Sequence, residues 1–381
     1  MYKIGTLNKI SKSGLSIFDP AKYDISDDLS DSCGIIVRSY KMHEMSFSNS
    51  LMAIARAGAG VNNIPVDDCL EKGICVFNTP GANSNAVKEL VLAGMLMAYR
   101  NLSDAVSWIK TLRGDISAEV EKGKSSFKGH ELYGRTIGII GLGAIGRKLA
   151  NACSLLGMNV MGFDPFLSKQ NAVQLPQNTY IANSIAEMVP NCDFISLHLP
   201  VNSDTKGLID KSILSCMKPG TVLLNFARDT LVNEDDLIDS LESGIIKKYV
   251  VDFATEKLLL REDVISIPHL GASTTESEDN CARMAAMELI NFLENGNTVN
   301  SVNFPNVDAG SMPANTRICI LTKNEPDPLK LGLAMFADKK IISAKANIKG
   351  NFGYAVFDTD DEIISVPSVP EVIRVRILKK D

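Results

Sequence analysis

Three glycines in a short run near the middle of the chain constrain its fold more than any other feature. Gly141, Gly143 and Gly146 follow the apolar stretch Thr136–Ile140 and begin an amphipathic stretch. A Gly-x-Gly-x-x-Gly run between a strand and a helix allows a tight turn, a close approach of the backbone to a bound group and close packing of helix on strand. Asp164 ends the next apolar stretch. These residues predict a βαβ unit of a parallel sheet.

The same unit, from about Thr136 to Asp164, is predicted to bind a dinucleotide. The helix that opens at Ala144 and Ile145 directs backbone N–H groups and its positive dipole end toward an anion such as a pyrophosphate. A carboxylate at the position of Asp164 accepts hydrogen bonds from ribose hydroxyls and repels a 2′-phosphate. We therefore expect NAD as the cofactor rather than NADP. The alternative is a Gly-rich turn in another α/β fold.

Apolar runs alternate with amphipathic stretches along the chain, which is typical of parallel βαβ units. In the first part we predict strands at 3–7, 35–38, 52–56 and 74–78, a helix at about 85–100, and a loop or crossover at 114–134. Further strands are predicted at 136–140, 159–164, 194–199, 222–225, 249–252 and 264–267, followed by a helix at 276–295. The tail pattern is a strand at 317–322, a helix at 329–336, and strands at 341–348, 354–358 and 372–378.

These elements predict an α/β protein with two doubly wound parallel-sheet domains, of Rossmann or flavodoxin type, and a small α+β domain. Residues 1–94 and 276–304 would form a discontinuous substrate domain, into which residues 95–275 are inserted as the cofactor domain. A stretch rich in Asn, Pro and Gly at 296–311 is the predicted linker to a third domain at 315–381.

Composition argues against several classes of protein. The 381 residues carry a net charge of −6, which disfavours a general nucleic-acid binder or a binder of anionic membranes. The longest apolar stretch, Leu90–Tyr99, is too short to span a bilayer. The eight cysteines include no Cys-x-x-Cys pair, so we expect reduced thiols, no metal site and a cytoplasmic location.

Three residues with useful chemistry follow predicted strands of the second domain, at the edge where a doubly wound sheet binds its ligands. Histidine side chains in general titrate near neutrality, and the imidazole of His269 could take the proton of a substrate hydroxyl while hydride leaves the same carbon. The carboxylate of Glu256 would hold that imidazole in one orientation. The guanidinium of Arg228 would bind a substrate carboxylate through two donors. Together they fit the oxidation of a 2-hydroxy acid.

Several segments resemble known families. Asn225–Arg228 with Val232, Asp252–Glu256 and Pro268–Ser273 resemble the three signatures of D-isomer-specific 2-hydroxyacid dehydrogenases. Ile36–Ser39, Arg56–Asn63 and Asn78–Asn83 resemble a narrower group of that family, the D-3-phosphoglycerate dehydrogenases. The close resemblance covers about residues 1–305, and the tail resembles a shortened ACT domain.

The resemblance implies roles for individual residues. Arg228, Glu256 and His269 match the catalytic residues of the family. The implied NAD contacts are Gly141, Gly143, Ala144, Ile145, Gly146, Asp164, Phe226, Ala227, Arg228, Asp252, His269, Leu270, Gly271 and Ala272. The implied substrate contacts are Arg38, Ser39, Arg56, Gly58, Arg228 and His269. Arg38 and Arg56 match arginines that hold the substrate phosphate, and arginine suits forked contacts to phosphate.

The implied activity is NAD-dependent oxidation of D-3-phosphoglycerate, a phosphorylated 2-hydroxy acid, to 3-phosphohydroxypyruvate, the first step of L-serine biosynthesis. The resemblance also implies a homodimer or tetramer, with an interface at about residues 89–128 and the active site in a cleft between the two α/β domains. One alternative is another dehydrogenase of the same chemistry, such as a glyoxylate or hydroxypyruvate reductase. The other is an NAD(H)-sensing scaffold without activity.

The chain departs from the family pattern at several positions. Asp229 follows Arg228 where the family usually has glycine, which places a carboxylate beside Arg228; if the backbone there is left-handed, aspartate tolerates it better than most residues do. The turn before Glu256 is about one residue shorter. In the tail, Thr322 and Asp327 replace the histidine and glycine of the serine-binding turn, so we expect no feedback by L-serine, or feedback by another ligand. His198 ends a predicted strand and has either a structural role or a place beside the nicotinamide.

Overall fold

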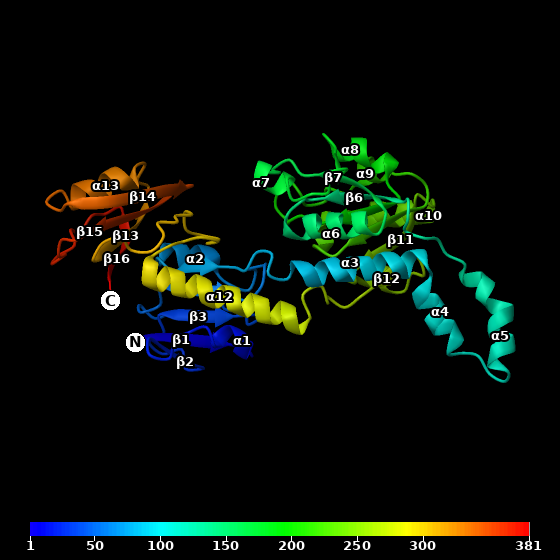
Figure 1. Ribbon diagram of the computed structural model, residues 1–381, viewed down its shortest axis with the longest axis horizontal. Coiled ribbons are helices and arrows are strands. Elements are labelled where there is room, and N and C mark those ends of the chain that lie inside the picture. Colours follow the sequence, from blue (N-terminus) through cyan, green and yellow to red (C-terminus); the bar gives the residue numbers. More distant parts are fainter. Residues whose placement is uncertain (381) are drawn as a thin grey trace. The chain divides into compact units, whose positions relative to one another are not determined.

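The computed structural model describes residues 1–380 and divides into two compact units (Figure 1). The first unit contains Met1–Asn83 and Thr275–Asp381, and the second contains Ser84–Thr274. The two breaks lie at residues 83/84 and 274/275, whereas the sequence predicted breaks at 94/95 and 275/276 and a separate tail domain. The division into three domains stays a prediction.

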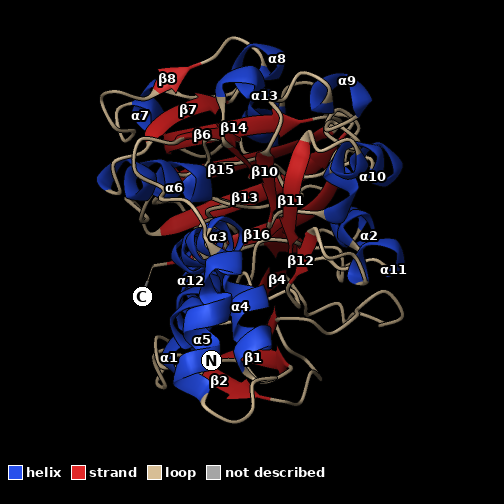
Figure 2. Cartoon of the chain, turned by 90° about the vertical axis from the view of Figure 1, so that its right-hand side faces the viewer, coloured by secondary structure: helices blue, strands red, loops and turns tan. Residues whose placement is uncertain are grey.

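The second unit is built on a seven-stranded parallel sheet in the order β12-β11-β10-β9-β6-β7-β8. Its strands are β6 (Thr136–Ile140), β7 (Asn159–Phe163), β8 (Tyr180–Ile181), β9 (Phe194–Leu197), β10 (Thr221–Asn225), β11 (Ile246–Val251) and β12 (Val264–Ser266). The short strand β8 lies at the edge beside β7 (Figure 2). Every residue of β10 is buried, as expected for an inner strand with both faces covered. The order of the strands reverses at β6. From β6 the chain adds β7 and β8 on one side, and it then adds β9 to β12 on the other side.

Helices cover this sheet and hold two apolar clusters against it. The helices are α3 (Ser84–Tyr99), α6 (Ala144–Leu155), α7 (Lys169–Ala172), α8 (Ile185–Met188), η2 (Val189–Asn191), α9 (Lys211–Leu214), η3 (Asp229–Leu231), α10 (Glu234–Glu242) and α11 (Glu256–Leu259). Val91 of α3 and Leu149 of α6 pack in one cluster with Ile139 of β6. Leu237 of α10 packs in the other cluster with Leu223 of β10. The sheet therefore has a core on both faces.

Residues 114–134, for which the sequence predicted a loop or crossover, contain helical structure. Helices α4 (Leu102–Ile109) and α5 (Ile116–Gly123) and the turn η1 (Lys124–Phe127) project from the end of α3 as an arm (Figure 1). The carboxylate of Asp115 caps α5 by accepting the N–H of Ala118. The indole of Trp108 packs on the ring of Phe127, with centroids 5.1 Å apart. The prediction of a loop was wrong here. Asp115 caps a helix directly after Gly114, although the composition of the segment is typical of a loop.

The first unit has a five-stranded parallel sheet in the order β2-β1-β3-β4-β5. Its elements are β1 (Tyr2–Leu7), α1 (Lys12–Leu15), β2 (Tyr23–Ser26), β3 (Gly34–Val37), β4 (Ala53–Arg56), α2 (Val66–Glu71), β5 (Cys75–Phe77) and α12 (Thr275–Asn295). Buried side chains of α12, among them Leu289 and Phe292, pack with Ile36 of β3. The edge strand β2 was not predicted, because only one of its four residues is buried.

The same unit carries a four-stranded antiparallel sheet in the order β14-β15-β13-β16. Its elements are β13 (Thr316–Lys323), α13 (Pro328–Met335), β14 (Ile341–Lys349), β15 (Phe352–Thr359) and β16 (Val372–Lys379), in the order that the sequence predicted. Helix α13 packs on one face of this sheet (Figure 1). Two parallel α/β sheets and a small C-terminal sheet confirm the predicted fold class.

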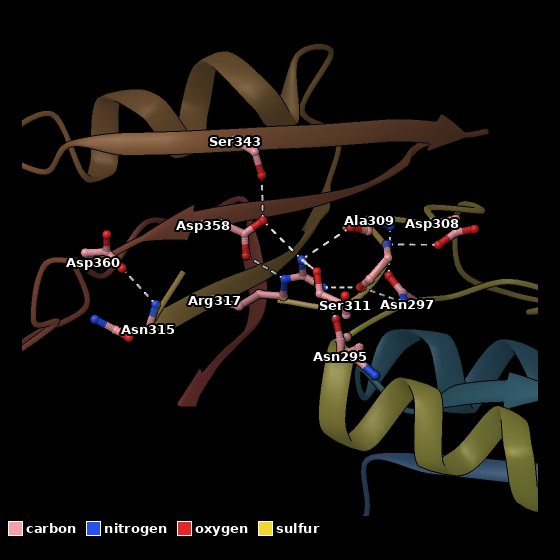
Figure 3. Close-up of polar contacts among 12 residues, drawn as sticks. Asn295, Asn297, Asp308, Ala309, Ser311, Asn315, Arg317, Ser343, Asp358 and Asp360 are labelled. Carbon is pink, nitrogen blue, oxygen red and sulfur yellow. Dashed lines mark hydrogen bonds and ion pairs between the residues drawn. The ribbon is translucent and has the colours of Figure 1, made fainter. Parts of the chain in front are cut away.

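Arg317 of β13 fastens this small sheet to the end of α12 (Figure 3). Its guanidinium forms a fully buried two-point ion pair with Asp358 of β15, with distances of 2.7 and 3.1 Å. The same guanidinium donates to the carbonyl oxygens of Asn295 and Gly310 at 2.7 and 2.8 Å. Asp358 also accepts from the hydroxyl of Ser343 at 2.6 Å. Both ions are therefore satisfied in the interior of the unit.

Among residues 1–380, no helix combines the length and the apolar character that crossing a membrane requires.

Candidate functional site

The Gly141 loop joins β6 to α6, and glycine occupies its three positions for different local reasons. Gly141 has φ +94°, and a Cβ on it would lie 2.4 Å from the carbonyl oxygen of His198. A Cβ on Gly146 would lie 2.0 Å from the carbonyl oxygen of Gly141. Gly143 is exposed, and a Cβ there would meet nothing within 4 Å. Packing fixes the first and third glycines, whereas the second borders open space in front of the α6 N-terminus, which fits a pyrophosphate.

Asp164 follows β7 and helps to shape this loop. One carboxylate oxygen accepts the N–H of Leu142 and the other accepts the N–H of Phe166, each at 2.9 Å. The side chain is half-buried. Each oxygen keeps a further lone pair, so the carboxylate can still accept from ribose hydroxyls. The geometry at Asp164 thus fits the predicted NAD contact.

Arg228 lies in a turn that Asn225 organises at the end of β10. The buried amide of Asn225 donates to the carbonyl oxygen of Arg228 at 2.8 Å, and its oxygen accepts the N–H of Ala227 at 3.2 Å. The guanidinium of Arg228 is exposed. The role of Asn225 was missed in the sequence, although a polar residue ending an otherwise apolar strand is the signal that could have revealed it.

The backbone at Asp229 is not left-handed. It begins the turn η3, and its φ is not positive. Its carboxylate accepts the N–H of Thr230 at 2.8 Å. Within residues 1–380 no ion pair joins it to Arg228. The turn thus closes without a left-handed residue.

Asp252 follows β11 and holds a buried carboxylate close to two predicted catalytic residues. Its side chain is 2 % exposed, and neither carboxylate oxygen has a hydrogen-bond partner in the described part of the chain. Burial raises the pKa of Asp252, while the neighbouring His269, the backbone N–H groups of Gly271 and Asp252, and Arg228 act in the opposite direction. A buried carboxylate that still has acceptor capacity fits a place for the carboxamide N–H groups of a nicotinamide.

His269 follows β12 and is exposed, and its imidazole packs on the ring of Phe253 with centroids 4.5 Å apart. Glu256 is the first residue of α11 and is also exposed. No hydrogen bond or ion pair between Glu256 and His269 occurs in residues 1–380. The structure thus brings Asp252 and Phe253, rather than Glu256, next to the imidazole. Phe253 was missed because only tertiary packing places it there.

His198 directly follows β9 and lies against the Gly141 loop. Its Nε2 lies 2.9 Å from the hydroxyl of Ser196, and its Nδ1 is buried without a partner in the described residues. Burial lowers the pKa of His198 to about 4, so the ring is neutral at physiological pH. Its carbonyl oxygen forms the wall against which Gly141 packs. This arrangement supports a structural role at the loop.

The predicted substrate arginines lie at the ends of two neighbouring strands of the first unit. Arg38 follows β3 and Arg56 ends β4, and the Nε of Arg56 donates to the carbonyl oxygen of Arg38 at 3.1 Å. Gly58 has φ +155°, and a Cβ on it would lie 2.3 Å from a guanidinium nitrogen of Arg56. Ser39 is exposed, and its N–H donates to the side chain of Asn8 at 2.9 Å. Glycine at position 58 therefore makes room for Arg56.

Comparison with known proteins agrees with this arrangement. Residues 92–271 match the model of the D-isomer specific 2-hydroxyacid dehydrogenase, NAD binding domain. The chain is 34% identical over 295 residues to D-3-phosphoglycerate dehydrogenase of Methanocaldococcus jannaschii, covering 75% of this chain and 54% of that protein. It is 31% identical over 323 residues to the Bacillus subtilis D-3-phosphoglycerate dehydrogenase, covering 80% of this chain and 59% of the relative. The chain thus spans little more than half the length of these curated relatives.

Among solved structures, the chain is similar to NAD+-bound 3-phosphoglycerate dehydrogenase of Entamoeba histolytica, with a TM-score of 0.62 and 26% identity over 79% of this chain and 98% of that one. The fold is also similar to that of Rhodotorula graminis D-mandelate dehydrogenase, with a TM-score of 0.69 and 22% identity over 81% and 99% of the two chains. Residues 92–271 are therefore an NAD-binding domain of the D-isomer-specific 2-hydroxyacid dehydrogenase family.

Proposed function

We propose that this protein catalyses the NAD-dependent oxidation of D-3-phosphoglycerate to 3-phosphohydroxypyruvate, the reaction that opens L-serine biosynthesis. The observation that carries the proposal is the grouping of His269, Arg228 and the buried Asp252 around the ends of β10, β11 and β12. The similarity to D-3-phosphoglycerate dehydrogenases supports the choice of substrate.

In this proposal each residue has a defined task. A ring nitrogen of His269 takes the proton of the C2 hydroxyl, and Arg228 binds the C1 carboxylate. Bound NAD supplies the acceptor for the hydride that leaves C2. Asp252 accepts the carboxamide N–H of the nicotinamide and orients it. Glu256 remains the proposed acidic partner of His269, although the structure shows no contact between them.

Arg38 and Arg56 are proposed to bind the phosphate, with Ser39 and Gly58 shaping the loops that carry them. Two guanidinium groups on adjacent strands form a pair of forked donors, which suits a phosphate dianion. A substrate without a phosphate group does not need both arginines. The pair therefore favours phosphoglycerate over lactate or glyoxylate.

The experiment that tests the proposed function is a substrate panel. Initial rates of NADH formation are measured with D-3-phosphoglycerate, D-glycerate and D-lactate, and NADH consumption is measured with glyoxylate and hydroxypyruvate. We expect the highest kcat/KM among the hydroxy acids with phosphoglycerate, and Arg56→Ala should raise its KM at least tenfold. Faster turnover of glyoxylate or hydroxypyruvate, with no effect of Arg56→Ala, would support a reductase instead. No hydride transfer with any of them would support an NAD(H)-sensing scaffold.

We also propose that the protein forms a homodimer, or a tetramer built from such dimers, through the arm. Helices α4 and α5 expose apolar side chains at Leu102, Val106, Ile109 and Ile116. Exposed apolar side chains gathered on one projecting element favour association. Val106→Glu should shift the mass measured by light scattering to the monomer, whereas Val173→Glu, at another exposed position of the same unit, should not. A cytoplasmic location is proposed as well, since all eight cysteines are free and seven are buried.

A further inference from the structure

Arg38, one of the two proposed phosphate ligands, already has an anionic partner within its own unit. Its Nη1 lies 2.8 Å from a carboxylate oxygen of Glu278 in the first turn of α12. The two side chains are 38% and 43% exposed. A guanidinium and a carboxylate at this distance form a charge-assisted hydrogen bond that both solvent and a ligand can reach.

The position of Glu278 at the start of α12 gives it a second source of stabilisation. Helix N-termini favour anions, so the helix holds this carboxylate where a bound phosphate would also be favoured. Cys281 lies one turn further along α12, where burial raises its pKa, while hydrogen bonds with Thr79 and Ser277 and, less strongly, the charges of Arg56 and Arg38 act in the opposite direction. Both guanidinium groups thus act on the first turns of α12, and Glu278 offsets part of their charge.

An exposed ion pair of this kind is weak, because water screens both ions. A phosphate dianion with several acceptor oxygens can displace one carboxylate from the guanidinium. A substrate that ends in a neutral hydroxymethyl group cannot displace that carboxylate. The pair therefore makes access to Arg38 depend on the charge at the far end of the substrate.

We propose that Glu278 is a specificity-determining residue of the phosphate subsite, an internal counter-ion that a substrate phosphate must displace from Arg38. This inference rests on the proposed function for the identity of the phosphorylated substrate. Glu278 holds Arg38 in place when no phosphate is bound. It lowers the affinity for phosphate because its carboxylate competes with the phosphate for the guanidinium of Arg38.

The test compares Glu278→Gln with Glu276→Gln, a matched change at an exposed position of the same helical turn. We expect Glu278→Gln to lower the KM for D-3-phosphoglycerate by about three- to tenfold, with kcat unchanged and the KM for D-glycerate unchanged. The KM for phosphoglycerate should also rise more steeply with salt than in the wild type, because the subsite has gained net positive charge. Glu276→Gln should leave every value unchanged. Equal effects on both substrates would overturn the proposal.

A double-variant cycle separates competition for Arg38 from a general effect on α12. In an Arg38→Ala background, Glu278→Gln should no longer change the KM for phosphoglycerate, because the shared guanidinium is gone. An undiminished effect in that background would overturn the proposal.

Direct binding of inorganic phosphate distinguishes failure of this inference from failure of the proposed function. Isothermal titration of the protein with phosphate should show about three- to tenfold tighter binding for Glu278→Gln than for the wild type and Glu276→Gln. If phosphate binds more tightly while phosphoglycerate is never oxidised, the proposed function fails and the counter-ion role stands. If binding of phosphate is unchanged or weaker, the counter-ion role fails whatever the enzyme oxidises.

Discussion

The imidazole of His269 packs against the phenyl ring of Phe253, with ring centroids 4.5 Å apart and ring planes inclined by 48°. Phe253 directly follows the buried Asp252, so the segment after β11 supplies both an apolar wall for the imidazole and a carboxylate near it. Contact with Phe253 fixes one face of a ring that is otherwise exposed. This geometry fits the role proposed for His269, since a proton acceptor must keep its orientation while it stays accessible to a substrate.

Replacing His269 by asparagine should remove the proton acceptor and leave cofactor binding intact. We expect kcat for phosphoglycerate to fall by about 10²–10⁴, the range typical of a lost general base. Titration of intrinsic fluorescence with NADH should give a Kd within about twofold of the wild type. His43→Asn, at an exposed position of the first unit, is the control. Wild-type turnover by His269→Asn would eliminate the histidine as the base.

Asp252→Asn should weaken cofactor binding without lowering the thermal stability of the protein. Burial disfavours the charged form of Asp252 more than its neighbours favour it, so we expect the neutral amide to leave the melting temperature at pH 8 equal or to raise it. If the carboxylate binds the nicotinamide carboxamide, the Kd for NADH should increase about tenfold. Asp204→Asn in an exposed loop is the control. An unchanged Kd for NADH would argue against Asp252 as a cofactor ligand.

The features that could be predicted from sequence are those with a local cause. The Gly141 loop, the strands around it and the antiparallel tail follow from turn residues and apolar periodicity. The placement of Phe253 against His269 and of Glu278 against Arg38 depends on tertiary packing, since Arg38 and Glu278 are brought together only when α12 returns to the first sheet. The sequence left open whether the backbone at Asp229 is left-handed, and this turn closes without a left-handed residue there.

Glu288 of α12 should make the stability of the protein depend on pH. Its side chain is 8 % exposed, one oxygen accepts from Asn300 at 3.0 Å, and the other has no partner in residues 1–380. Burial raises the pKa of Glu288 from 4.5 to about 8. The folded state therefore holds a proton that the unfolded chain releases above pH 4.5. The contribution of Glu288 is fully present below pH 4.5 and is lost progressively as the pH rises to about 8.

Glu288→Gln keeps an acceptor for Asn300 and removes this titration. We expect little difference from the wild type in melting temperature at pH 5, and a variant several degrees more stable at pH 8.5, measured by calorimetry. Glu276→Gln, exposed on the same helix, should follow the wild type at both pH values. A constant offset between Glu288→Gln and the wild type from pH 5 to 8.5 would show that Glu288 does not titrate in this window.

The buried pair Arg317–Asp358 should be far more sensitive to substitution than an exposed one. Arg317→Met would leave Asp358 buried without its counter-ion and would remove a donor from the carbonyl oxygens of Asn295 and Gly310, the second of which keeps the amide of Asn297 (Figure 3). We expect a loss of about 3–5 kcal/mol in the free energy of unfolding, measured by urea denaturation. The double variant Arg317→Met/Asp358→Leu should recover part of that loss, because the unpaired charge is then removed.

The matched control is Arg261→Met, which breaks the pair between Arg261 and Asp263. These side chains are 24% and 30% exposed, so water screens the charge left behind. We expect a loss of at most about 1 kcal/mol. Similar losses for Arg317→Met and Arg261→Met would mean that Arg317 does not hold the small sheet to α12. A large loss for Arg317→Met alone, partly restored in the double variant, identifies the buried charge as the cause.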